Sequence, residues 1–151
     1  MTTLNNISAT EVAKFMIAAD QTVVNLNTAQ LQLYGNLCKE ECMELLVGIN
    51  KLCAPGGLTE ENLQEVLDGA GDLVWVALGA QYSCGVNPQQ VHDAIATSNH
   101  TKTVAGKLIK HPVTKKVLKP DTYRTPELEF LVRDILVHRT NLRTQRTFAV
   151  K

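Results

Sequence analysis

The sequence predicts an all-α fold, in which about five helices form a bundle that is completed by oligomerisation. Apolar residues recur at intervals of three and four over long segments, as they do in amphipathic helices. Capping residues and short turns containing Pro or Gly separate these segments. A chain of 151 residues is the size of one domain. We therefore expect a single domain over 1–151, with its core at about 8–138 and a loose tail over 139–151.

The first two predicted helices occupy the N-terminal third of the chain. Ser8 followed by Glu11 forms a capping-box pattern, which predicts a helix over about 9–20. Asn27 offers the cap of a long helix over about 28–53, and an Ala-Pro-Gly-Gly turn ends it. The apolar stripe of this long helix is formed by Leu31, Tyr34, Cys38, Cys42, Leu45, Ile49 and Leu52.

The next two helices follow from capping residues in the same way. Thr59 precedes two glutamates and predicts a helix that reaches about Cys84. Residues 73–80 of that helix are apolar on every side, so other helices or a partner subunit must enclose them. Asn87 followed by a proline predicts a further helix that ends near Asn99.

The C-terminal part is less regular. Residues 101–125 are rich in Lys, Pro and Thr and have room for a short hairpin. A Thr-Pro-Glu sequence at 125–127 predicts the start of a last helix, which carries apolar side chains along one face. The final residues lack periodicity, which predicts the loose tail.

Composition excludes several classes of protein. Fifteen basic and fifteen acidic residues cancel, so no net field attracts nucleic acid or an anionic membrane. The N-terminus lacks the pattern of a signal peptide, and no apolar run reaches membrane-spanning length. The four cysteines lack zinc-site spacing, and Cys38 and Cys42 are interpreted as buried small hydrophobes. We therefore expect a cytoplasmic protein that binds neither nucleic acid nor membrane.

Acidic residues occupy helix faces that otherwise look buried. Glu41 lies three residues after Cys38 and four before Leu45, within the apolar stripe of the long helix. Glu44 projects from the same face, and Glu40 lies at its edge.

The following helix carries a second acidic row, in which Glu65, Asp68 and Asp72 share one face. Burying an unpaired carboxylate costs several kcal/mol. Acids that converge from two helices would make an oxygen-rich site suited to a hard cation such as magnesium. The alternative is that these acids form an ordinary solvated face.

Three segments together resemble the MazG-like all-α nucleoside triphosphate pyrophosphohydrolases. Residues 39–44, Lys-Glu-Glu-Cys-Met-Glu, look like the EExxE motif of that superfamily. Residues 68–76, Asp-Gly-Ala-Gly-Asp-Leu-Val-Trp-Val, are similar to its acidic motif before an apolar helix. Residues 98–102, Ser-Asn-His-Thr-Lys, resemble the SNxSK signature of one branch of this superfamily. The superfamily as a whole includes dimeric dUTPases and phosphoribosyl-ATP pyrophosphohydrolases.

The resemblance implies that Glu41, Glu44 and Asp72 bind Mg²⁺ or Mn²⁺, and that Glu40 orients or activates the attacking water. The second family motif usually reads ExxD, whereas the residue three before Asp72 is Gly69. The substitutes are Asp68 and Glu65. We favour Asp68, since side chains at i and i+4 lie close on a helix.

The resemblance also implies that Asn99 and Lys102 contact the substrate, and Lys107 would add to them. The implied reaction converts a nucleoside triphosphate, either a deoxynucleotide or a non-canonical nucleotide, to monophosphate and pyrophosphate in a homo-oligomer, a dimer or a tetramer. Two alternatives stay open at this point. One is phosphoribosyl-ATP hydrolysis, and the other is a catalytically inactive helical interaction module.

Overall fold

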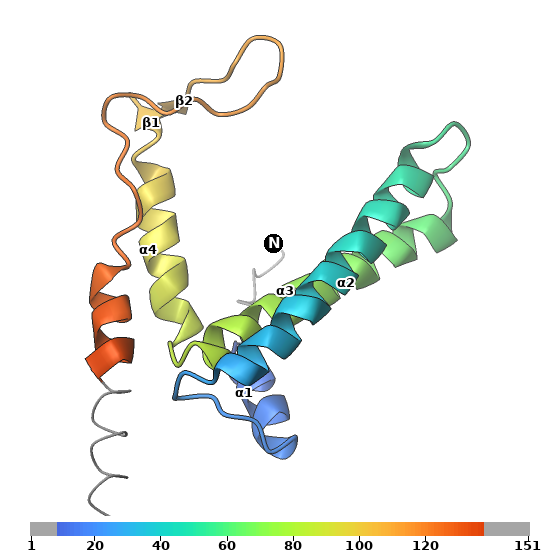
Figure 1. Cartoon of the computed structure of the whole chain (residues 1–151). Coiled ribbons are helices and arrows are strands. Elements are labelled where there is room, and N and C mark those ends of the chain that lie inside the picture. Colours follow the sequence, from blue (N-terminus) through green and yellow to red (C-terminus); the bar gives the residue numbers. More distant parts are fainter. Residues whose placement is uncertain (1–8, 138–151) are drawn as a thin grey trace, which may run out of the picture. The chain divides into compact units, whose positions relative to one another are not determined.

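The computed structural model describes residues 9–137, which form two compact units that meet in sequence between Val86 and Asn87. The all-α prediction is confirmed, because helices make up most of the described residues and the strands among them form one small two-stranded sheet (Figure 1). Ser8 and the expected tail lie outside the described residues. The single-domain expectation for the whole chain stays a prediction. Each unit is described separately below.

The first unit consists of α1 (Ala9–Ala18), α2 (Thr28–Cys53) and α3 (Glu60–Ser83). α2 and α3 lie side by side as a long helical hairpin, and α1 packs against α3 (Figure 1). The predicted caps are confirmed: the side chains of Asn27 and Thr59 accept hydrogen bonds from backbone N–H groups three residues later, at 3.1 and 3.2 Å. Such bonds satisfy donors that the first turn of a helix leaves unpaired.

Two glycines allow α2 and α3 to approach each other closely. A Cβ atom added at Gly69 would lie 3.1 Å from the backbone N and Cα of Leu45. One added at Gly48 would lie 3.3 Å from Cγ2 of Val66. Both glycines are buried. The backbones of the two helices therefore meet at the level of the predicted acidic residues.

The core of this unit lies where α1 meets the hairpin. Its buried apolar side chains are Val12, Met16, Tyr34 and Val76. The hydroxyl of Tyr34 donates a 2.8 Å hydrogen bond to Oε1 of Gln21. Nε2 of the buried Gln30 donates to Oγ of Ser83 at 2.8 Å, so a polar contact ties the start of α2 to the end of α3.

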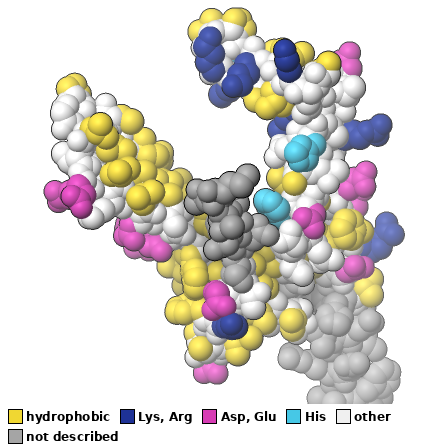
Figure 2. Space-filling model, turned by 180° about the vertical axis from the view of Figure 1, so that it is seen from behind, with side chains coloured by type: hydrophobic (Ala, Val, Ile, Leu, Met, Phe, Trp, Pro, Cys, Tyr) yellow, Lys and Arg dark blue, Asp and Glu magenta, His cyan; other side chains and the backbone are white. Residues whose placement is uncertain are grey.

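One expectation about burial is wrong for the described chain, and another is met only in part. Cys42 is exposed, although Cys38 is half-buried. In the apolar segment 73–80, Val74 is 40% exposed and Trp75 is 37% exposed; Phe15 contacts Trp75 edge-on at 5.8 Å. The helices of one chain therefore do not enclose this segment fully, and its enclosure by a partner subunit stays a prediction. Apolar side chains are visible along the hairpin in Figure 2.

The second unit begins with α4 (Pro88–His100), capped by the side chain of Asn87 as predicted. The predicted hairpin is present as β1 (Thr103–Val104) and β2 (Lys107–Leu108), paired antiparallel. The last helical segment covers 129–137 of the described chain. It starts later than the predicted 125–127, because hydrogen bonds to the end of α4 hold residues 122–124 in a non-helical conformation.

Candidate functional site

The predicted metal site lies on the α2–α3 hairpin. α2 carries Glu40, Glu41 and Glu44, and α3 carries Asp68 and Asp72. The two helices contact each other along their length, and the Gly69 contact places the Asp68–Asp72 turn opposite the middle of α2. The hairpin thus brings both acidic rows to one region.

Glu41 is the electrostatic centre of this region. Desolvation is the largest cause that raises the pKa of its carboxyl, although the side chain is only half-buried. The negative charges of Glu44, Asp72, Glu40 and Asp68, in that order, raise this pKa further. The other four predicted carboxylates therefore lie close enough to Glu41 for their charges to act on its carboxyl group.

The burial expected for these acids is not found. Glu40, Glu44, Asp68 and Asp72 are exposed in the described chain. The reason is that the flank of a two-helix hairpin faces solvent, whereas the sequence pattern alone suggested a covered face. Within residues 9–137, none of the five carboxylates forms an ion pair with a Lys, Arg or His side chain.

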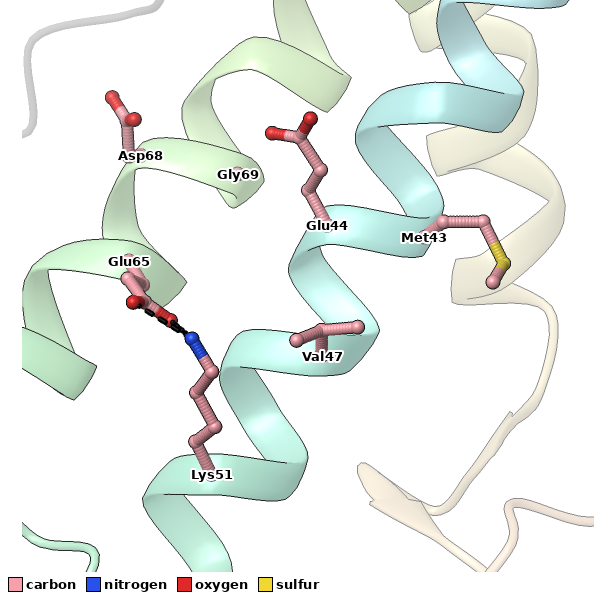
Figure 3. Close-up of a pocket in the computed structure, with 7 residues that line it drawn as sticks. All are labelled: Met43, Glu44, Val47, Lys51, Glu65, Asp68 and Gly69. Atoms are coloured by element: carbon pink, nitrogen blue, oxygen red, sulfur yellow. Dashed lines mark hydrogen bonds and ion pairs between the residues drawn. The ribbon is translucent and has the colours of Figure 1, made fainter.

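A hollow of about 340 Å³ lies beside this cluster on the hairpin (Figure 3). Its lining combines acidic, apolar and basic side chains: Met43, Glu44, Val47, Lys51, Glu65, Asp68 and Gly69. Nζ of Lys51 donates to both carboxylate oxygens of Glu65, at 2.7 and 2.9 Å. Figure 3 shows this ion pair at one end of the hollow and the Glu44 carboxylate near Gly69 at the other.

The same contacts bear on the departure from the ExxD motif at Gly69. A side chain at this position would start against the backbone of Leu45, so glycine is what permits the close approach of the helices. Glu65 is engaged by Lys51. Of the two substitutes named from sequence, Asp68 is the one without an ion-pair partner in the described part of the chain.

The donor chemistry of the cluster fits a hard divalent cation, because all five groups offer carboxylate oxygens and their mutual repulsion is uncompensated. As the side chains stand, however, no group of three or more His, Cys, Asp or Glu residues within 9–137 is arranged to hold a metal ion. Exposed carboxylate side chains change rotamer rapidly. A metal at Glu41, Glu44, Asp68 and Asp72 would therefore require these side chains to turn toward a common point.

The predicted substrate-binding residues belong to the second unit. Nζ of Lys102 donates a 2.6 Å hydrogen bond to Oδ1 of Asn99. Asn99 is not the C-cap of α4, because Thr101 takes that position. Lys107 lies in β2 and is exposed. The structure thus pairs two of the three predicted residues.

Two further residues beside Lys102, Lys119 and Tyr123, were not predicted to bind the substrate, although their order along the chain belongs to the resemblance to MazG-like enzymes. Nζ of Lys102 lies 5.6 Å from the ring centroid of Tyr123, and Nζ of Lys119 lies 4.5 Å from the same centroid. Lys102 is far from Lys119 and Tyr123 in the sequence, so helical or strand periodicity does not predict that they meet. Only the path of the intervening residues brings them together.

Comparison with known proteins adds no assignment: no protein-family model matches the chain, and no curated protein matches its sequence.

None of the helices in the described range 9–137 combines the length and the apolar character that crossing a membrane requires.

Proposed function

We propose that this chain is a magnesium-dependent nucleoside triphosphate pyrophosphohydrolase, which converts a deoxynucleoside or non-canonical nucleoside triphosphate to the monophosphate and pyrophosphate. The observation that carries this proposal is the convergence of four carboxylates on Glu41 from two adjacent helices, with no cationic partner among the described residues. Like charges that converge in this way repel one another, and a divalent cation would remove the repulsion. The resemblance to MazG-like enzymes supports the same reaction.

The proposed roles follow the chemistry of each side chain. Glu41, Glu44, Asp68 and Asp72 would hold Mg²⁺ or Mn²⁺, an ion that neutralises charge on phosphate oxygens and lowers the pKa of bound water when present. Glu40, at the edge of the cluster and exposed, would accept a hydrogen bond from the attacking water and orient it toward the α-phosphorus.

The substrate-binding roles are assigned to the second unit. Asn99 fixes the ammonium group of Lys102 by a 2.6 Å hydrogen bond, which favours one orientation of a long flexible side chain. Lys102 would then offer its remaining N–H donors to phosphate oxygens. Lys107, exposed on β2, would add a second positive charge.

We further propose that the enzyme works as a homo-oligomer, a dimer or a tetramer. Met43 and Val47, which line the hollow beside the acids, are 56% and 49% exposed. Leu46 on α2 and Leu67 on α3 are 49% and 65% exposed. A second copy of the hairpin would cover such side chains as neighbouring helices do in a four-helix bundle. Light scattering coupled to size-exclusion chromatography measures the state, and Val47→Glu should shift it toward monomer.

The function is tested with a panel of canonical and modified nucleoside triphosphates in the presence of Mg²⁺, with release of pyrophosphate and monophosphate as readouts. Glu41→Gln should abolish turnover, because it removes the central carboxylate. Glu61→Gln is the matched control, since Glu61 is an exposed glutamate in the first turn of α3. It should keep full activity.

The outcomes separate the alternatives. Pyrophosphate release that Glu41→Gln abolishes and Glu61→Gln retains would establish the activity and name the substrate. Turnover that survives in Glu41→Gln would refute the assignment. Hydrolysis of phosphoribosyl-ATP alone would select that alternative reaction. No turnover of any substrate, with no change in melting temperature on adding Mg²⁺, would favour an inactive interaction module.

A further inference from the structure

The segment that connects α4 to the last helical segment is strongly basic. Residues 101–120 contain six lysines and no Asp or Glu. In Figure 2, Lys and Arg side chains gather at the end of the second unit that carries β1 and β2. The positive charges of such a segment repel one another unless negative charges neutralise them. The places where its lysines lie close together are therefore candidate sites for an anion.

Two of these lysines converge on one aromatic ring. Nζ of Lys119 lies 4.5 Å and Nζ of Lys102 lies 5.6 Å from the ring centroid of Tyr123. The two ammonium groups are therefore no farther apart than those two distances together. Neither lysine forms an ion pair with any carboxylate in the described range, although Asp121 follows Lys119 by two residues.

The backbone on both sides of Tyr123 is fixed to the end of α4. The N–H of Arg124 donates to Oγ1 of Thr101 at 2.9 Å, and the hydroxyl of Thr122 donates to the carbonyl of Thr101 at 3.2 Å. Ser98, only 4% exposed, donates through its hydroxyl to the carbonyl of Arg124 at 2.7 Å. Three bonds to Ser98 and to Thr101, the C-cap of α4, thus fix the chain on both sides of the half-buried Tyr123.

We infer that Lys102, Lys119 and Tyr123 form a binding site for the phosphate groups of the nucleotide, an inference that rests on the proposed function. A contact with a ring face occupies no N–H donor of an ammonium group, and each ammonium has three. Lys102 gives one to Asn99, and Lys119 gives one to the Tyr123 hydroxyl. The remaining donors of both lysines are available to phosphate oxygens, and two positive charges near one point match a pyrophosphate group.

The tyrosine hydroxyl is consistent with a site for an anion. Hydrogen bonding with Ser98 is the largest cause that lowers the pKa of the Tyr123 hydroxyl, and the charges of Lys119 and Lys102 lower it further. A positive local field of this kind attracts a phosphate oxygen as it does a phenolate.

The test measures binding of inorganic pyrophosphate to the full chain without divalent cations, by calorimetry at low ionic strength, where exposed charges are least screened. Lys119→Ala and Lys102→Ala should each weaken binding by at least about fivefold. Tyr123→Leu should weaken it as well, because the ring no longer gathers the two ammonium groups. Lys116→Ala is the matched control: it removes the same charge from an exposed position of the same segment and should change affinity less than about twofold.

Equal losses in Lys116→Ala and Lys119→Ala would mean general attraction to a basic segment and would overturn the site. Unchanged affinity in Lys119→Ala, or no binding by the unmodified chain, would also overturn it. Because neither metal nor hydrolysis is involved, the result is separate from the proposed function. Pyrophosphate binding without turnover of any nucleotide would uphold this site and refute the hydrolase. Turnover of a nucleotide, with pyrophosphate affinity unchanged in Lys119→Ala, would uphold the hydrolase and refute this site.

Discussion

Replacing Gly69 by alanine tests whether the contact between α2 and α3 excludes a side chain where MazG-like enzymes carry a ligand. The new Cβ would lie 3.1 Å from the backbone N and Cα of Leu45. Backbone atoms of a helix cannot turn away as a side chain can, so the helices must separate slightly. Overpacking of this kind costs about 1–3 kcal/mol, whereas alanine gains about 1 kcal/mol over glycine inside a helix. The net effect is a destabilisation of up to about 2 kcal/mol.

Gly71→Ala is the control in the same helix, because a Cβ atom at Gly71 meets nothing within 4 Å. It should stabilise the protein by about 1 kcal/mol through helix propensity alone. The two variants should therefore differ by about 1–3 kcal/mol, or about 2–12 °C in melting temperature at 2–4 °C per kcal/mol, measured by circular dichroism. Gly69→Glu should be less stable than Gly69→Ala. If Gly69→Ala stabilises as much as Gly71→Ala, the contact does not exclude a side chain.

Three other predictions follow from named contacts. Gln30→Leu should destabilise the protein by about 2–4 kcal/mol in urea unfolding, because it removes hydrogen bonds of 2.7 and 2.8 Å to the Thr22 backbone and of 2.8 Å to Ser83 and leaves buried polar groups unpaired. Thr59→Ala should cost about 1 kcal/mol in the same assay, through loss of the α3 cap. The raised pKa of Glu41 means that its protonation favours the folded state. Its contribution to stability is full below the usual glutamate range and is lost as pH rises through the raised pKa. In the presence of a chelator that removes divalent cations, the melting temperature should be measured as pH rises from the usual glutamate range through the raised pKa. It should fall more for the unmodified chain than for Glu41→Gln.

The parts of the fold that sequence predicted are those set by local interactions. Asn27, Thr59 and Asn87 each bond to a backbone N–H two or three residues later, so a few residues suffice to place the helix starts. The delayed start of the last helix depends instead on bonds from Ser98 and Thr101 to a segment more than twenty residues away. No local pattern contains that information.

The candidate site divides in the same way. Helical spacing predicted that Glu41 and Glu44 share a face, because spacing alone determines this. Their exposure depends on how many layers cover the hairpin, which periodicity does not specify. The contact of Lys102 with Tyr123 was missed for a related reason, since it depends on the path of the chain through β1 and β2.

Exposure changes the physical argument for a metal. A buried carboxylate must be paired or metal-bound, because burying it unpaired costs several kcal/mol. In the described chain the cluster faces solvent except for the half-buried Glu41, so water screens the repulsion and the acids persist without a cation. The observation that still favours a metal is that four other carboxylates lie close enough to Glu41 to raise its pKa. Under the proposed function, a second copy that covers Met43 and Val47 would also reduce the water around Glu44. Coulombic attraction for a divalent ion would then grow as the effective dielectric constant falls. Metal binding and oligomerisation would therefore strengthen each other, since linkage between two binding equilibria is reciprocal.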